Sequence, residues 1–449
     1  MAKQKRQSWS NRLTYVMTVA GATVGFGATW RFPYLVGENG GGAYVFLFCI
    51  AMLMIGIPMI LVENVIGRRM QVNSIDAFGS GGGKKIASAW KILGYMGLLG
   101  AFGILAYYMV LGGWVLTYIG NLFSGSLDLS SPVTVEVTSA FFNDNIANNP
   151  LTVTIYTALF VLINYIILAR GIVDGIERSV KYLMPILFIA LIIMIVRNIT
   201  LPGSLEGIKF YLMPDFSKIT PKLFVFVLGQ VFFALSLGFG VLITLSSYLD
   251  KNENLVKTAV ITGIMNTLIA VLAGFMIFPS LFSFNIPPDS GPTLVFQSLP
   301  IVFSYMWGGT FFAIVFFTLL IIAALTTSLT IYEVIITVLQ EKTRMTRKTA
   351  IALTLSVIFI IGNIPSILGD SVWKNISIMG MSIFNAFDYI SGNILFILTA
   401  LGCTIFVGFV LKEEAKTELN ASPGFTAFWF NYVRYVIPVI ILVIFFNSL

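Results

Sequence analysis

The sequence predicts an all-α polytopic membrane protein, and three observations carry this prediction. Of its 449 residues, 57% are hydrophobic and 10% are charged, and the mean hydropathy is +0.91. Several segments exceed the roughly 18 apolar residues that indicate a membrane-spanning helix, and the short alternating strands of an outer-membrane barrel are not visible in the pattern. Two of the predicted spans are also interrupted by the same Gly-Phe-Gly motif.

Eleven spans are expected, taken in order from a cytoplasmic N-terminus. The first five cover about 12–36, 42–67, 88–123, 151–169 and 178–196. The next five cover about 221–249, 257–283, 307–339, 348–368 and 376–411, and an eleventh covers 425–446. The expected organisation is therefore a transporter core over residues 1–411, with repeats at 1–200 and 221–411, and an additional helix over 425–449 that leaves the C-terminus outside.

The net charge of +7 is explained by topology. Most of the 27 Lys and Arg residues fall in segments assigned to the cytoplasm, as the positive-inside rule requires, so we expect no nucleic-acid partner. Cys49 and Cys403 lie in apolar stretches, which predicts neither a disulfide framework nor a zinc site. The chain has no histidine, which removes the usual catalytic base. No cleavable-signal pattern precedes the first span.

Glycines interrupt the first span at its centre. Gly21, Gly25 and Gly27 each cost a helix interior roughly 1 kcal/mol relative to alanine, so the helix is expected to break at Gly25-Phe26-Gly27. Broken backbone is tolerated inside a bilayer only where it lines a cavity or is buried in protein. We therefore predict a ligand or ion site at the middle of the membrane.

The sixth span repeats this feature at 236–240, which reads Ser-Leu-Gly-Phe-Gly. The first and sixth spans enter from opposite sides, and five spans begin with each of them. Two broken helices in corresponding positions are typical of an inverted five-plus-five repeat with a binding site at the midplane. The alternative is that these small residues only allow close helix packing.

Longer motifs resemble the neurotransmitter:sodium symporter family, and in particular its bacterial amino-acid transporters, of the leucine-transporter type. The resemblance covers 9–411 and rests on Gly25-Phe26-Gly27, Arg31-Phe32-Pro33-Tyr34, Glu38-Asn39-Gly40-Gly41-Gly42-Ala43, Tyr107-Tyr108, 230–240 and Ala323-Ala324-Leu325-Thr326-Thr327-Ser328. It implies sodium-coupled symport of a small molecule into the cell by alternating access. The family typically has twelve spans, whereas this chain is expected to have eleven.

The resemblance also implies a substrate site at the two breaks. Its expected residues are Thr23, Gly25, Phe26, Gly27, Ile104, Tyr108, Phe233, Ser236, Phe239, Ser328 and Ile331. Free N–H groups at helix breaks suit a carboxylate. Family members that carry amines have an aspartate where Gly25 stands, so glycine points to an amino acid that brings its own carboxylate. The apolar lining favours a neutral hydrophobic or aromatic side chain.

One sodium site is expected from carbonyl and hydroxyl oxygens. By resemblance it uses Gly21, Val24, Ala323, Thr326 and Thr327, although the hydroxyls alternatively bond back to their own helix. A second site retains Asn266, with Thr23 as a candidate oxygen, but alanines stand at 28 and 234 where the family has oxygen ligands. The chloride position also departs, because Phe48 and Ala270 replace its polar residues. We therefore expect one Na⁺ per substrate and no chloride dependence.

Charged residues suggest two gates. By resemblance, Arg31 and Asp388 close the outer side above Phe233, and Arg6 and Glu341 close the inner side with Trp9 and Tyr248. Glu63 is interpreted as a cap for the broken first span, whereas the sequence assigns no role to Glu333.

Other functions remain open at this point. A non-transporting amino-acid sensor with the same fold would share these motifs and would bind without flux. A channel fits less well because paired gates imply occlusion, and an enzyme fits least because no nucleophile–base pair or metal cluster is visible. The expected location is the bacterial inner membrane. A homodimer is compatible with the sequence.

Overall fold

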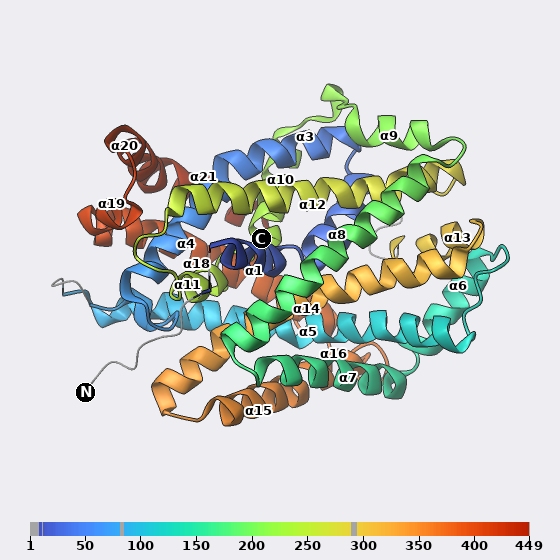
Figure 1. The fold of residues 1–449 in the computed structure, drawn as a ribbon, viewed down its shortest axis with the longest axis horizontal. Helices are drawn as coiled ribbons and strands as arrows, with labels where there is room; N and C mark the ends of the chain where they lie inside the picture. The colour runs from blue at the N-terminus through green and yellow to red at the C-terminus, as the bar shows by residue number, and fades with distance from the viewer. Residues whose placement is uncertain (1–8, 11, 81–84, 289–293, 449) are drawn as a thin grey trace.

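The computed structural model describes residues 9–10, 12–80, 85–288 and 294–448. Within these residues the regular structure is helical, apart from two isolated bridges, Gly41 with Pro214 and Ile378 with Met381. Long helices run side by side along the longest axis of the molecule (Figure 1). The all-α prediction is therefore confirmed.

The described residues of the first half of the chain form nine α-helices. They are α1 (Arg12–Thr23), α2 (Phe32–Glu38), α3 (Gly42–Ala51), α4 (Ile57–Met70), α5 (Ile92–Ser124), α6 (Val135–Phe142), α7 (Pro150–Leu168), α8 (Arg178–Ile199) and α9 (Ser204–Leu212). Short π-helical turns make several of them continuous with their neighbours, as between α3 and α4 (Met52–Gly56).

The second half continues the series to α21. Its helices are α10 (Pro221–Ala234), α11 (Val241–Ser246), α12 (Leu255–Ser283), α13 (Ser298–Ser304), α14 (Gly309–Thr343), α15 (Arg347–Val357), α16 (Ile364–Leu368), α17 (Ile383–Asp388), α18 (Phe396–Ile405), α19 (Glu413–Leu419), α20 (Pro423–Asn431) and α21 (Ile437–Ser448). A π-helical segment, η10 (Tyr389–Leu395), joins α17 to α18.

Nine continuous helices in the described residues are long and apolar enough to cross a membrane, and two shorter apolar ones lie at Leu13–Thr23 and Pro221–Ala234. The two short helices belong to the spans predicted to break. The tenth span begins at Ile383 rather than Ile376, because the preceding residues form a turn held by the Ile378–Met381 bridge. The connecting segments contain further helices, such as α6 and α9, where the sequence analysis predicted no span.

Both breaks fall at the predicted motifs. Helix α1 ends at Thr23, the chain bends at Val24 and Gly25, and a π-helical turn (Gly27–Arg31) leads into α2. Helix α10 ends at Ala234, and α11 begins only at Val241. Between them the backbone φ angles are +52° at Ser236, +85° at Gly238 and +78° at Gly240. Residues other than glycine rarely adopt this left-handed region.

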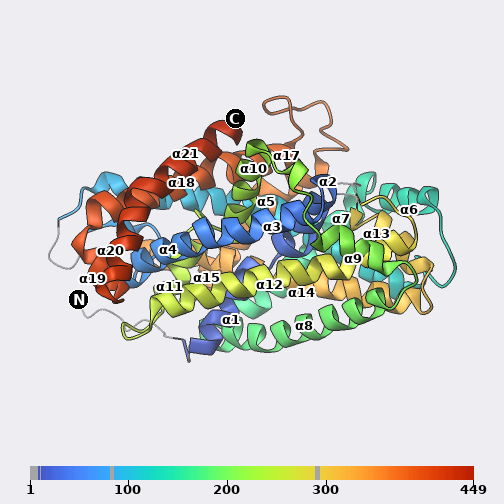
Figure 2. The same cartoon turned by 90° about the horizontal axis from the view of Figure 1, so that it is seen from above.

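The core lies around the first broken helix. Helix α1 packs against α8, α12 and α14, and α14 packs along α5. Figure 2 shows the C-terminal helices α20 and α21 at the edge of the bundle, near α18. Among the long apolar helices of the described residues, α5 and α14 are the most buried, and α14 contacts both α1 and α11.

Candidate functional site

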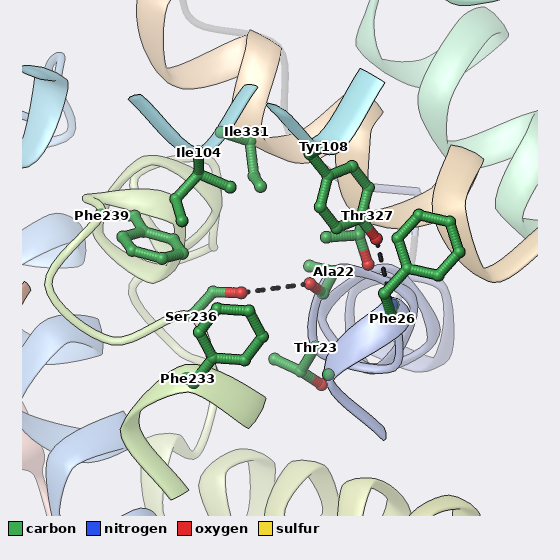
Figure 3. Close-up of a pocket in the computed structure, with 12 residues that line it drawn as sticks. Ala22, Thr23, Phe26, Ile104, Tyr108, Phe233, Ser236, Phe239, Thr327 and Ile331 are labelled. Carbon is green, nitrogen blue, oxygen red and sulfur yellow. Dashed lines mark hydrogen bonds between the residues drawn. The ribbon is translucent and has the colours of Figure 1, made fainter. Parts of the chain in front are cut away.

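A pocket lies between the two breaks, α5 and α14. Its lining residues are Ala22, Thr23, Gly25, Phe26, Gly27, Ile104, Tyr108, Phe233, Ser236, Phe239, Thr327 and Ile331. Figure 3 shows the aromatic and branched side chains of Ile104, Phe239, Phe233 and Ile331 around one end, and Tyr108 and Thr327 beside Phe26 at the other. The cavity volume is about 20 Å³, which is room for about one water, so a larger ligand requires side chains to move.

Two hydrogen bonds tie the breaks to their surroundings. The Phe26 N–H donates to the Tyr108 hydroxyl oxygen (3.2 Å), and the Ser236 hydroxyl donates to the Ala22 carbonyl (3.4 Å; Figure 3). Gly25 allows this arrangement, because a Cβ there would lie nearer than 3.0 Å to both Tyr108 and Thr327. Ten of the eleven expected substrate residues are thus brought together.

Ser328 is the exception. Its hydroxyl donates to the Asn164 side-chain oxygen on α7 (2.7 Å) and to the Leu325 carbonyl, and it does not line the pocket. Helix periodicity explains the difference, since residues 327 and 331 share one face of α14, whereas residue 328 is rotated by about 100°. Thr327, expected only at the sodium site, takes the place on the pocket wall.

Carbonyl and hydroxyl oxygens converge beside α1 at the expected sodium site. The Thr327 hydroxyl donates to the Gly21 carbonyl of the broken helix (2.9 Å). The Thr326 hydroxyl instead donates to the Ala323 carbonyl of its own helix (3.1 Å), which is the alternative considered above. Gly21 is needed for this closeness, because a Cβ would lie 3.1 Å from the Thr326 Cβ. Val24 is fully buried at the same bend. Oxygens of this kind are the ligands that hard cations prefer.

The second expected sodium position contains an internal amide bridge. Asn266 Nδ2 donates to the Thr23 carbonyl (2.9 Å) and to the Ala234 carbonyl (3.2 Å), the last residues of α1 and α10. Asn266 Oδ1 is buried without a partner. The Thr23 hydroxyl donates to the Ala20 carbonyl (3.1 Å) within its own helix, so it does not point to Asn266 as a replacement ligand.

The outer gate residues do not form a direct ion pair. Arg31 lies over the Phe233 ring, with the guanidinium carbon 4.2 Å from the centroid, while Asp388 Oδ1 accepts a hydrogen bond from the Tyr107 hydroxyl (2.7 Å). Among the residues that the structure describes, no salt bridge joins Arg31 to Asp388. Arg31 therefore contacts Phe233, the expected lid. Asp388, the expected partner of Arg31, is instead hydrogen-bonded to Tyr107.

At the inner side, Trp9 Nε1 donates to the Leu245 carbonyl (3.0 Å), and its ring packs edge-on against Tyr248 at 6.2 Å. Glu341 Oε2 accepts from the backbone N–H and the side-chain amide of Asn73 (both 2.9 Å). Arg6 lies outside the described residues. Three of the four expected inner-gate residues thus lie on this side, and Asn73 is a contact that the sequence interpretation missed.

The structure gives partners to two buried carboxylates, Glu333 and Glu63. Glu333 is 1% exposed and forms an ion pair with Arg347 (2.7 Å), close to the Tyr248 hydroxyl (3.3 Å). Glu63 Oε1 accepts from the Gly238 N–H (2.7 Å), so it caps the second break and not the first. The assignment of Glu63 to the first span was wrong because α4 lies against α11, beyond the second break.

An inverted repeat whose two broken helices share a buried pocket defines a secondary transporter. Comparison with known proteins gives the family. The model of the sodium:neurotransmitter symporter family matches residues 6–154 and 142–449. The chain belongs to this family, whose members are transporters and not enzymes.

Individual relatives are similar to this chain along nearly its whole length. A sodium-dependent transporter of Haemophilus influenzae is 72% identical over 99% of both chains, and one of Bacillus subtilis is 37% identical over 100% of this chain and 98% of its own. The crystal structure of MhsT in complex with L-phenylalanine superimposes with a TM-score of 0.89 at 35% identity, covering 99% of this chain and 100% of that chain.

Proposed function

We propose that the protein carries a neutral hydrophobic or aromatic amino acid into the cell, driven by one Na⁺ and without chloride. Sodium dependence follows from the family. The preference for an apolar side chain is supported by the pocket wall of Ile104, Phe233, Phe239 and Ile331, none of which can pair with a charged substrate. The similar MhsT structure holds L-phenylalanine.

The single observation that carries the proposal is the position of Thr327. Its side chain lines the substrate pocket and also donates to the Gly21 carbonyl at the candidate sodium site. One residue therefore belongs to both sites, so an ion on one side and a carboxylate on the other would each favour the same arrangement of α1 against α14. Coupling of this kind is what symport requires.

The proposed stoichiometry of one Na⁺ is supported by the amide of Asn266. A sodium ion needs several oxygen ligands, but the Thr23 and Ala234 carbonyls already accept from Asn266 Nδ2. Alanine at 28 supplies no side-chain oxygen. Phe48 and Ala270, both fully buried, likewise offer nothing polar to a chloride ion. With one Na⁺ per substrate, a balancing anion would not be needed.

Alternating access would open the pocket to each side in turn, with the N-terminus in the cytoplasm of the inner membrane and the C-terminus outside. The first, second, sixth and seventh spans would move against the rest. The narrow pocket fits this scheme, because binding of an amino acid requires lining side chains to move. Self-association into a homodimer stays a prediction.

The test is uptake of a panel of radiolabelled neutral amino acids into proteoliposomes, with Na⁺ replaced by K⁺ or chloride by gluconate. We expect sodium-dependent, chloride-independent uptake, and a reversal potential that gives one Na⁺ per substrate. Sodium-dependent binding without uptake would assign a sensor instead. The variant Ala28→Asn/Ala234→Thr restores two oxygens and should raise the ratio towards two; a ratio of two in the unaltered protein would refute the stoichiometry.

A further inference from the structure

Helix α19 lies at one end of the bundle, where it packs against α4 (Figure 2). Two of its carboxylates pair with the two arginines in the last turn of α4. Glu418 Oε1 accepts from Arg68 Nε (2.7 Å), and Glu414 Oε2 accepts from Arg69 Nε (2.8 Å). None of the functions proposed above uses these contacts.

Arg68 is at the centre of this contact. It is 1% exposed, and its guanidinium also donates to the main-chain carbonyls of Glu253 and Glu418. Lys251 Nζ donates to the Arg68 carbonyl (2.7 Å) and to Glu418 Oε2 (3.1 Å). Hydrogen bonds between charged groups are roughly twice as strong as neutral ones. Glu418 therefore joins α19 to two elements, the end of α4 and the connection between α11 and α12.

These contacts cross a boundary between parts that alternating access would move and parts that it would not. The second span ends in α4, and Lys251 lies in the segment that joins the sixth span to the seventh. All three spans belong to the set proposed to move. Helix α19 instead continues from η11 (Phe406–Leu411) at the end of the tenth span, which belongs to the rest. Movement of the first set must therefore either carry α19 along or break the contacts of Glu418.

The backbone at both ends of α19 is suited to such a change. The φ angle is +53° at Lys412, directly before the helix, and +50° at Asn420, directly after it. Residues other than glycine rarely adopt this region, so the surrounding structure has to hold them there. Hinges typically consist of a few residues at the ends of elements. The seven residues of α19 can therefore leave α4 by changes at the two ends of the helix, without unfolding.

We propose that Glu418 is a positioning residue of the transport cycle and that α19 acts as a latch. In the engaged latch, Glu418 holds Arg68 and Lys251 against the end of the tenth span, and the inner side stays closed. When the inner side opens, these contacts part and the charged groups become hydrated. The proposal rests on the alternating access proposed above, and none of its side chains belongs to the inner gate already described.

The test follows how readily the inner side opens. The reporter is Thr18→Cys in a Cys49→Ala/Cys403→Ala background, because Thr18 is fully buried and lies one turn before Gly21 on α1. Its rate of labelling by a water-soluble maleimide is measured in the purified full-length protein, with Na⁺ or with K⁺. Sodium should slow the labelling, because the candidate sodium site joins α1 to α14 through Gly21.

Glu418→Gln removes the charge of the latch and nearly keeps the shape of the side chain. In K⁺ we expect it to raise the labelling rate about tenfold, as loss of hydrogen bonds between charged groups does. Lys251→Gln should raise the rate only about twofold to threefold, because that lysine side chain is 47% exposed. Glu413→Gln is the matched control and should leave the rate unchanged, since Glu413 pairs with Lys416 of α19 itself.

Saturating Na⁺ should return the Glu418→Gln protein close to the labelling rate of the unaltered latch, because the candidate sodium site is untouched. Fast labelling that Na⁺ does not suppress would make Glu418 a purely structural residue and would overturn the proposal. Equal labelling of Glu418→Gln and Glu413→Gln in K⁺, with protection by Na⁺ intact, would overturn the latch and leave alternating access in place. If Na⁺ protects none of the variants, the opening motion itself is refuted, and the latch with it. If Glu418→Gln does not fold, the comparison of Lys251→Gln with Glu413→Gln decides.

Discussion

Replacing Gly25 by alanine tests the arrangement of the site most directly. The added Cβ would lie nearer than 3.0 Å to the Tyr108 hydroxyl, the Thr327 hydroxyl and the Thr327 Cβ. One of those side chains must therefore shift, and both are held by hydrogen bonds to the broken helix, at Phe26 and Gly21. Insertion of a methyl group into a packed site costs about 1–3 kcal/mol. Where this strain falls on the substrate-bound arrangement alone, it corresponds to a loss of affinity of roughly fivefold to 150-fold.

The assay is equilibrium binding of a radiolabelled transported amino acid at several Na⁺ concentrations. We expect the Gly25→Ala protein to bind the substrate more weakly and to require more Na⁺, because Thr327 belongs to both candidate sites. Gly424→Ala is the control, since its Cβ would meet nothing within 4 Å. Unchanged affinities for both amino acid and Na⁺ in the Gly25→Ala protein would refute this account of the break.

Two further predictions concern an ion site and an acidic side chain outside the membrane spans. Thr327→Val should raise the Na⁺ concentration for half-maximal uptake by about tenfold or more, because one ligand oxygen is lost. Thr330→Val is the control and should change this concentration little, because the Thr330 hydroxyl donates to the Thr327 carbonyl of its own helix. Partial burial raises the pKa of Asp76, but hydrogen bonds from Lys342 and Lys91 outweigh it and lower the pKa from 3.8 to about 2. The ionised Asp76 therefore contributes its full stabilisation above about pH 4 and loses it towards pH 2. The thermal unfolding temperature of the protein in detergent should fall over this interval. The Asp76→Asn protein should show a smaller fall.

Much of the fold was accessible from the sequence because the membrane imposes it. Apolar length and the two Gly-Phe-Gly motifs predicted the spans and both breaks, since a bilayer leaves few alternatives to helices. The errors fell where that constraint is absent. The sequence analysis predicted no element over 135–142 and 204–212, which form α6 and α9. Short helices outside the apolar spans leave only a weak pattern.

The sequence predicted which residues belong to the site more reliably than it predicted which way each side chain points. The same motif supplied Thr327 and Ser328, and only the rotation of α14 decides that the first faces the pocket and the second faces Asn164. A motif gives spacing along one helix, but it does not say which neighbour each face meets. Resemblance alone therefore placed Ser328 on the pocket wall and assigned Thr327 to the sodium site only, whereas Thr327 lines the pocket.

Partners separated far along the chain were the hardest to foresee. Asn266 bridges the ends of α1 and α10 from a third helix, and its two acceptors are main-chain carbonyls that no side-chain pattern reveals. Glu333 and Arg347 lie only 14 residues apart, yet they meet only because the chain turns between α14 and α15. Loss of Arg347 would leave the buried Glu333 carboxylate uncompensated, at a cost of several kcal/mol. Such an ion pair can be assigned only when both helices are placed, which is why the sequence assigned no role to Glu333, whereas the structure pairs it with Arg347.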